Sequence, residues 1–427
     1  MGADMTHVPR TPAGSGRSRS HLTLIVEVLT VVVLGAFSMA AASTTTTIRT
    51  PRGDTADLGK PTAPPISSLS SIACTSEEHC VAMGISVKGV AKVPQAEAAA
   101  QTMFGIAART SDGGVHWASF SLPTRIETPP ALSCPSANSC VAVGGTVVAN
   151  HVQSSLMPKG STPNPLGLGK VVRTTDGGET WARSVIPPGV GTLRGVSCPT
   201  KTFCMAVGET PDGNRGVALV TTNSGRAWTH LSLPRGEERL SLVSCRTMND
   251  CVVVVDNLRA TIITTTNAGN SWAETSLPQP PTGSIGNDIS EGISCPSSTH
   301  CFIVGGFTLG DGTPSALVFA SSNGGNLWAS QSPPSDTTGL FGISCPTPTT
   351  CVAVGGGYGG VGGVVLTTTD AGQTWTSRSE PAAVSGLQKI SCPTLDRCVA
   401  TGTSPSVPQP MVVTSSDGGI TWTSFIP

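Results

Sequence analysis

The sequence predicts an all-β fold, a single seven-bladed β-propeller made of four-stranded antiparallel blades. Three observations predict it: seven tryptophans at regular intervals, fourteen cysteines in seven close pairs, and one turn motif that recurs seven times. A chain of 427 residues with 50 Gly, 34 Pro and only 12% charged residues suits many short strands joined by turns. Repeats of this length are typical of propellers.

Every cysteine belongs to a C-x5-C pair, and no cysteine is left over. The pairs are Cys74/Cys80, Cys134/Cys140, Cys198/Cys204, Cys245/Cys251, Cys295/Cys301, Cys345/Cys351 and Cys392/Cys398. Each pair brackets a turn between two expected strands, where cross-strand distances suit a disulfide. We therefore expect seven disulfides, each within one blade. We expect no metal, because no further ligands recur beside the pairs.

The seven tryptophans each close the same motif, S/T-x-D/N-x-G-x-x-W, which we call the box; its glycine is the box glycine. Its Asp or Asn and its Trp are Asp112/Trp117, Asp176/Trp181, Asn223/Trp228, Asn267/Trp272, Asn323/Trp328, Asp370/Trp375 and Asp417/Trp422. The acidic or amide side chain is expected to cap a tight turn, with the glycine at positive φ and the tryptophan folded back over it. These residues are therefore expected to be structural, not catalytic.

Each unit is expected to contain four strands, A to D. In the sixth unit strands A, B and C are expected at residues 340–345, 351–355 and 363–369, and strand D from Trp375. Because the strands alternate in direction, the Cys-pair turns (A–B) and the boxes (C–D) share one face, which we call the stapled face. The B–C and D–A connections form the opposite, variable face.

Length variation is concentrated on the variable face. Cys80 and Trp117 are 37 residues apart and Cys140 and Trp181 are 41 apart, whereas this distance is 24 in three other units. The extra residues lie at about 86–104 and 146–168. Insertions on one face usually mark the binding face.

The N-terminus has the order of an export signal. Arg10, Arg17 and Arg19 precede an apolar run, residues 22–42, that ends in small residues. Residues 1–42 are thus expected to be a signal peptide or a membrane anchor, since the run is also long enough to span a bilayer. A Thr/Pro-rich linker follows at 43–66, and the propeller occupies 67–427. With fourteen cysteines, this order predicts a protein that is secreted or anchored outside the cytoplasm.

The repeated unit, with its G-x-I-S strand, AVG strand and box, resembles the BNR or Asp-box propellers. Within this sialidase- and sortilin-like group it is most similar to the photosystem II assembly-factor type, with a Cys pair added to each blade. The resemblance implies a protein-binding scaffold. It also leaves a glycoside hydrolase, sialidase-like or other, as the alternative, with an acidic site at the central opening. Tyr358, the only tyrosine, has no carboxylate near it in sequence, which disfavours a sialidase.

We expect a monomeric, non-enzymatic propeller that needs no cofactor and binds a protein or a cell-surface glycan through its variable face. A net charge of −1 gives no electrostatic basis for nucleic-acid binding. Candidate binding residues follow from position alone. The residue four before the strand-A cysteine should emerge at the central opening, which singles out Arg194, Glu291, Phe341 and Gln388, with Lys389 beside them. The two large loops add Lys88, Lys92, His151 and Lys159.

The first prediction is export with the propeller outside the cytoplasm. N-terminal sequencing of the purified protein is expected to give a mature start near Ser43 if the apolar run is cleaved, or an intact Met1 in the membrane fraction if it is an anchor. Soluble cytoplasmic protein with reduced thiols would contradict both.

Overall fold

The computed structural model describes residues 66–88, 102–128, 130–146, 167–234, 238–257, 261–279, 291–356, 362–379, 381, 384–404 and 409–427. The side chains of residues 87, 88, 102 and 103 are not among the described ones. All these residues lie within one compact unit, Ala56–Pro427. None of them belongs to a helix of sufficient length and hydrophobicity to cross a membrane. The apolar run at 22–42 lies outside the described residues.

Seven four-stranded antiparallel sheets confirm the predicted fold. The first three blades are β1 (Ser68–Cys74), β2 (Cys80–Lys88), β3 (Thr102–Thr110) and β4 (Ala118–Ser121); β5 (Ala131–Ser136), β6 (Ser139–Gly145), β7 (Gly169–Thr174) and β8 (Ala182–Arg183); and β9 (Leu193–Ser197), β10 (Cys204–Glu209), β11 (Gly216–Thr221) and β12 (Thr229–His230). The fourth and fifth are β13 (Leu240–Cys245), β14 (Cys251–Val255), β15 (Thr261–Thr265) and β16 (Ala273–Ser276); and β17 (Gly292–Ser294), β18 (Cys301–Thr308), β19 (Pro314–Ser321) and β20 (Ala329–Gln331).

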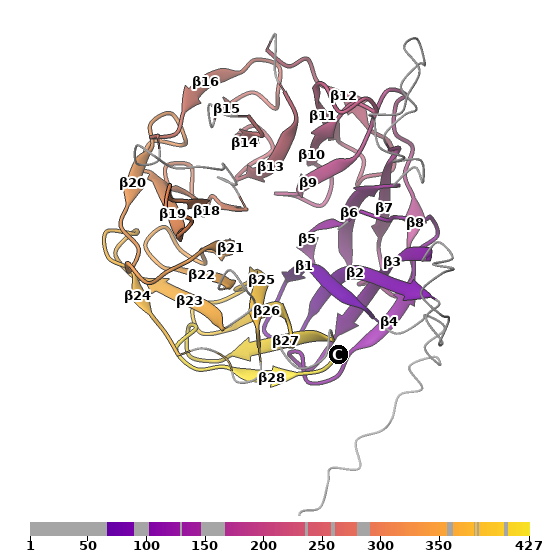
Figure 1. Cartoon of the computed structure of the whole chain (residues 1–427). Coiled ribbons are helices and arrows are strands. Elements are labelled where there is room, and N and C mark those ends of the chain that lie inside the picture. The colour runs from indigo at the N-terminus through magenta and orange to yellow at the C-terminus, as the bar shows by residue number, and fades with distance from the viewer. Residues whose placement is uncertain are drawn as a thin grey trace, which may run out of the picture. The chain divides into compact units, whose positions relative to one another are not determined.

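The sixth blade is β21 (Leu340–Ser344), β22 (Cys351–Gly356), β23 (Gly363–Thr368) and β24 (Thr376–Ser377), and the seventh is β25 (Gly386–Ser391), β26 (Cys398–Thr403), β27 (Pro410–Ser415) and β28 (Thr423–Phe425). The strand boundaries predicted for the sixth unit therefore agree with the structure to within one residue at every end. Strands A lie nearest the centre of the ring and strands D at its rim (Figure 1).

Every blade is continuous in sequence, so the ring closes without a strand exchanged between its ends. Blade 7 lies directly beside blade 1 (Figure 1). There Leu69 and Ile72 of blade 1 pack with Val399 and Val412 of blade 7 in one buried cluster. Similar clusters join the other neighbouring blades, so the core of the protein lies in the seams between sheets.

All seven predicted disulfides are present, one in each blade. The first cysteine of a pair lies at or near the end of strand A and the second at or near the start of strand B, with Cα atoms 4.0 to 4.1 Å apart. In blades 1 and 4 the paired cysteines are direct cross-strand partners in the sheet. No described cysteine is free.

Each box is held by a short set of side-chain hydrogen bonds. In blade 6 the Thr368 hydroxyl donates to the carboxylate of Asp370 (2.8 Å) and accepts from the amide of Gly372 (3.0 Å). The hydroxyl and amide of Thr374 lower the pKa of Asp370 from 3.8 to about 2. The carboxylate therefore stabilises the folded turn above its unfolded pKa, and this contribution is lost as the pH falls through about 2.

The box glycine has positive φ in every blade, as predicted, and so does the residue before it. That second position carries a side chain at Ser224, Ala268 and Ala371, where φ is 62°, 59° and 60°. The indole nitrogen of Trp117, Trp181, Trp228, Trp328 and Trp422 donates to the box glycine carbonyl, which confirms that these rings fold back over the turn. Trp272 instead donates to the carbonyl of Ser232 in the preceding blade.

The box is also bonded to the A–B turn of its own blade. The backbone amide before the box glycine donates to a carbonyl of that turn in all seven blades, over 2.7 to 3.0 Å; in blade 2, for example, Gly177 donates to Asn138. The A–B turns and the boxes therefore lie on one face, as the strand order predicted.

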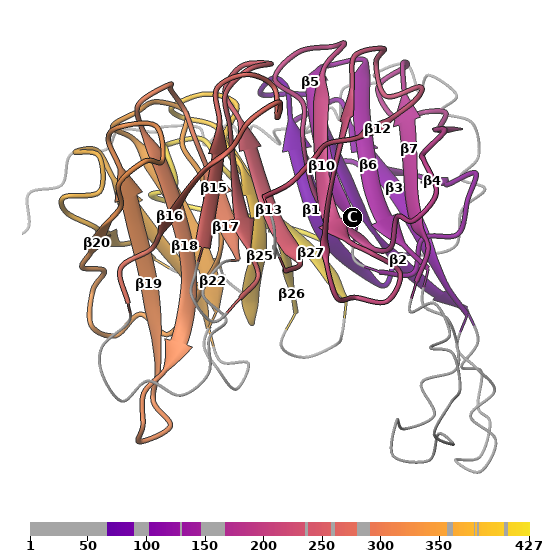
Figure 2. The same ribbon diagram turned by 90° about the horizontal axis from the view of Figure 1, so that it is seen from above.

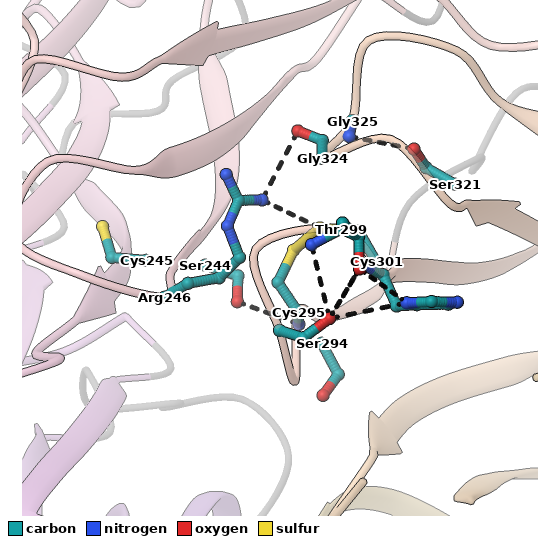
Figure 3. The surroundings of a disulfide bond; sticks show 12 residues. Ser244, Cys245, Arg246, Ser294, Cys295, Thr299, Cys301, Ser321, Gly324 and Gly325 are labelled. Atoms are coloured by element: carbon teal, nitrogen blue, oxygen red, sulfur yellow. Dashed lines mark hydrogen bonds between the residues drawn. A yellow bond between two sulfur atoms is a disulfide. The ribbon is translucent and has the colours of Figure 1, made fainter. Parts of the chain in front are cut away.

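A serine directly before the first cysteine joins six of the seven blades to the next one. In six of the seven seams its hydroxyl accepts a hydrogen bond of 2.9 to 3.2 Å from the backbone amide of the first cysteine in the following blade. Ser244 and Cys295 form this bond between blades 4 and 5 (Figure 3). Ser391 and Cys74 form it at the closing seam. The seam between blades 1 and 2 differs, because Ala73 takes the place of the serine.

Strand length varies at the variable face. The β18–β19 hairpin projects from this face beyond its neighbours (Figure 2), and its turn is closed by a hydrogen bond from the amide of Leu309 to Thr313. The β2–β3 hairpin has the longest strands, nine residues each. Residues 89–101 and 147–166, most of the two predicted insertions, lie outside the described residues.

The seam serine gives the second prediction. The Ser344→Ala substitution leaves the buried amide of Cys392 without its acceptor, so the free energy of unfolding should fall by about 1–2 kcal/mol. The Ala73→Ser substitution supplies the missing acceptor at the first seam and should raise it by about 0.5–1.5 kcal/mol. Denaturant unfolding with intact disulfides measures both.

Ser330→Ala, on the exposed strand β20, is the matched control and should change this free energy by less than about 0.5 kcal/mol. If Ser344→Ala behaved like this control, the hydrogen bond between blades would contribute nothing to stability.

Candidate functional site

A cavity of about 680 Å³ occupies the centre of the ring, and strands A of all seven blades line it. Its wall also includes Thr128 and Thr192 from D–A connections and Asp256 and Asn257, which follow strand β14. The cavity therefore reaches the variable face. Charged side chains in the wall are Arg194, Asp256, Glu291 and Lys389.

A β-bulge near the start of strand A brings Ser70, Arg194 and Ser241 into the wall of this cavity. The residue four before the strand-A cysteine is skipped by the ladder in five blades, at Ser70, Arg194, Ser241, Phe341 and Gln388. In blade 5 the amide of Glu291 bonds to Val304, which also pairs with Gly292, so Glu291 occupies the same position. A bulge turns one side chain out of the alternation of the sheet.

A glycine on strand B makes this bulge possible. A Cβ atom at Gly208 would lie 2.1 Å from the carbonyl oxygen of Thr192, and one at Gly355 would lie 1.9 Å from that of Gly339. Only glycine allows strand A to enter the blade so closely. The glycine of the AVG pattern therefore fixes the position of the bulge in strand A.

Two arginines and two carboxylates form a connected ion-pair network on one side of the cavity. Arg194 binds Glu209, with both carboxylate oxygens 3.2 Å from Nη2. Arg239 lies 3.9 Å from the same carboxylate and 3.3 Å from that of Asp256. Glu209 is the most buried of the four, and the other three are about 40 to 45% exposed. The network links blades 3 and 4 and remains open to solvent.

Lys389 crosses the opposite side of the cavity and ties three blades together. Its ammonium group donates to the carbonyls of Phe341 in blade 6 (2.6 Å) and Glu291 in blade 5 (2.5 Å). Gly342 and Gly292 stand at the equivalent position in those blades, and a Cβ atom at Gly342 would lie 3.0 Å from the Cα atom of Lys389, so these glycines let neighbouring strands A approach closely. Burial lowers the pKa of the Lys389 ammonium, and the charge of Glu291 opposes part of this shift.

The structure thus brings Arg194, Glu291 and Lys389 together in one cavity wall. Gln388 is exposed beside them, and the ring of Phe341 packs against Gly339 instead of lining the cavity. Lys88 ends strand β2, but its side chain is not described; Lys92, His151 and Lys159 lie outside the described residues.

Sequence reasoning missed Glu209, Arg239 and Asp256. Glu209 and Asp256 stand at or just past the end of strand B, and Arg239 just before strand A. A search for charged residues at strand ends facing the variable side would have found them. Their pairing across two blades could not be predicted, because it depends on the seam geometry.

The carboxylates around the cavity are not arranged as a facing pair. Each carboxylate described here lies beside a cationic side chain, whereas a glycosidase needs two carboxyl groups facing one bond. Among the described residues, no three His, Cys, Asp or Glu side chains are grouped so that they could hold a metal ion.

No protein-family model matches the sequence, and no curated protein matches it either. Among solved structures, the chain is similar to YCF48 from Cyanidioschyzon merolae, with a TM-score of 0.50 and 16% identity over 81% of this chain and 96% of that one. YCF48 bound to a D1 peptide gives a TM-score of 0.48 and 15% identity over 71% and 82%.

The GH74 xyloglucanase from Xanthomonas campestris is also similar, with a TM-score of 0.53 and 11% identity over 85% of this chain and 55% of that one. At these identities the likeness shows the fold alone. The protein is a seven-bladed β-propeller with one disulfide in each blade.

The two hydrogen bonds of the Lys389 ammonium across the cavity give the third prediction. Lys389→Met keeps most of the apolar stem but removes both hydrogen bonds to the carbonyls, so the free energy of unfolding should fall by about 1–3 kcal/mol. Gln388→Ala, at the neighbouring exposed bulge, is the control and should change it by less than about 0.5 kcal/mol. A more stable Lys389→Met variant would mean that the cost of burying the ammonium outweighs its hydrogen bonds.

Proposed function

We propose that this protein is an extracytoplasmic, non-enzymatic propeller that recognises a protein or a cell-surface glycan through its variable face. The observation that carries the proposal is the cavity of about 680 Å³ at the ring centre, with charged side chains in its wall. Its size is that of an ordinary ligand site.

The position of the charges supports recognition. Arg194 and Asp256 are both about 40% exposed, so each can contact a ligand while its ion-pair partner holds it in place. Arg194 stands on a strand fixed by its neighbours, and Asp256 directly follows one, which limits the entropy lost on binding. A polar ligand with both hydrogen-bond donors and acceptors would match this wall.

Seven disulfides support a place outside the cytoplasm. A disulfide in every blade is typical of proteins that fold in an oxidising compartment. The predicted export signal would deliver the propeller there.

A glycoside hydrolase is the second candidate, because Asp256 and Glu291 line the same cavity. Hydrolysis would require one of the two to be protonated and the other ionised. Asp256 is paired with Arg239 over 3.3 Å, and Lys389 bonds to the backbone carbonyl of Glu291, so each carboxylate already has a cation beside it and binding is the better supported function.

The fourth prediction locates the binding face. A photo-crosslinking residue at exposed Gln388, on the variable side, is expected to trap a partner on the producing cell. The same residue at Met248, 46% exposed on the stapled turn of blade 4, is expected not to trap that partner. Mass spectrometry identifies the products, and adducts formed equally at both positions would contradict the proposal.

A glycan array and a panel of chromogenic glycosides complete the test. Saturable glycan binding that is lost in Arg194→Glu, with no turnover, supports a glycan-binding propeller. Turnover that is abolished by Glu291→Gln or Asp256→Asn would contradict a non-enzymatic function and support the hydrolase.

A further inference from the structure

The residue before the box glycine occupies an equivalent place in each seam of the stapled face. It is itself a glycine at Gly113, Gly177, Gly324 and Gly418, with φ between 72° and 75°. A Cβ atom at each would lie 2.8 to 3.0 Å from the same carbonyl of the A–B turn in its own blade. The four sites can therefore be compared directly.

At two of these sites an arginine from the preceding blade reaches the glycine. Arg246 of blade 4 donates to the carbonyl of Gly324 over 3.4 Å and lies 3.2 Å from the sulfur of Cys301 (Figure 3). Arg397 of blade 7 donates to the carbonyl of Gly113 in blade 1. Both carbonyls are those of the glycine before the box glycine.

The two arginines reach this place from different positions in the sequence. Arg246 directly follows the first cysteine of its blade, whereas Arg397 directly precedes the second. Two unrelated positions thus deliver the same chemical group to the same backbone acceptor. The protein itself therefore shows that this place between blades accommodates a guanidinium group.

Between blades 1 and 2 the corresponding place is open. A cavity of about 190 Å³ lies there, with Thr75 and His79 at the positions that hold Arg246 and Arg397 elsewhere. Within 4 Å of a Cβ atom at Gly177 lie only oxygen atoms, the carbonyl of Ala137 and the side-chain oxygen of Asn138.

The charge of this cavity favours a cation. Its ionisable wall residues besides His79 are Arg109, Asp176 and Glu179, a formal charge of −1. Glu179 pairs with Arg109 over 2.5 Å, which leaves the charge of Asp176 uncompensated. Burial alone would raise the pKa of Asp176, but hydrogen bonds from Thr174 and Thr180 outweigh this and lower it. Asp176 is therefore ionised at neutral pH.

We propose that the seam between blades 1 and 2 is a socket for the guanidinium group of an arginine side chain in a partner protein. The group would take the place that Arg246 and Arg397 have in their seams and donate to the carbonyl of Gly177. Asp176 supplies the compensating charge, and Glu179 neutralises Arg109 in the same wall. The socket lies on the stapled face, so it is independent of the function proposed for the variable face.

The test uses the full protein with intact disulfides and a blocked tripeptide, acetyl-Gly-Arg-Gly-amide, followed by calorimetry and by NMR of the labelled His79 ring. One molecule of the arginine peptide should bind saturably and shift the His79 signal. The lysine peptide should bind about tenfold more weakly, because a point charge lacks the planar donors. The citrulline peptide, which keeps the shape without the charge, should not bind.

Three variants distinguish binding in this socket from non-specific attraction of the peptide to the protein surface. Thr75→Arg supplies an internal guanidinium from the position of Arg246 and should abolish binding. Thr349→Arg, at an exposed position in the stapled turn of blade 6, is its control and should leave binding unchanged. Glu179→Gln, exposed and hence harmless to folding, should weaken binding about tenfold.

Equal binding of the citrulline peptide, or undiminished binding by Thr75→Arg, would overturn the proposal. If Thr75→Arg does not fold, the Glu179→Gln result decides in its place, and undiminished binding there has the same meaning. Free arginine bound about tenfold more tightly than the peptide would overturn the assignment to a protein side chain.

Discussion

The hydrogen bonding of the A–B turn is the interaction on which the rest of the structure depends. In each blade this turn carries the disulfide, and one of its carbonyls accepts the amide that positions the box. In six seams the first cysteine also donates its backbone amide to the preceding blade. One short segment therefore fixes a blade internally and sets its place in the ring. The closing seam, between Ser391 and Cys74, uses the same serine hydrogen bond as five other seams, so ring closure requires no additional interaction.

The two faces of the ring are therefore held in different ways. The stapled face is held by bonds that recur with distances differing by a few tenths of an ångström, so its backbone has little freedom. The variable face is held mainly through the strands below it, and there the hairpins differ in length. The central cavity joins the two, since strands A line it and the bulged residues Ser70, Arg194 and Ser241 are in its wall. Substitution at a bulge such as Arg194 changes the cavity wall without disturbing the ladder.

Much of the fold could be predicted because its determinants are local in sequence. The Cys pairs, the boxes and the strand alternation each lie within a few residues, and their sevenfold recurrence fixes the blade number. The G-x-I-S pattern was visible too, but the role of its serine was not, since its partner lies in the next blade. Lys389 was predicted as a candidate binding residue at the central opening, but its bonds to the carbonyls of Glu291 and Phe341 could not be predicted, because these partners lie 98 and 48 positions away in the sequence. Arg246 and Arg397 lie at different positions relative to the cysteines of their blades. Only the three-dimensional structure shows that both donate to the carbonyl of the equivalent glycine.

The short span of every disulfide has a consequence for how the chain acquires its covalent structure. Correct partners are six positions apart in all seven pairs, whereas a wrong partner in another blade requires a much larger loop to close. Loop-closure entropy grows with loop length, so native sulfur pairs meet more often than foreign ones even before the sheets form. Oxidation can then proceed blade by blade as each unit becomes available. Fourteen cysteines permit a very large number of pairings, but the spacing steers the chain towards one, with little need for later reshuffling.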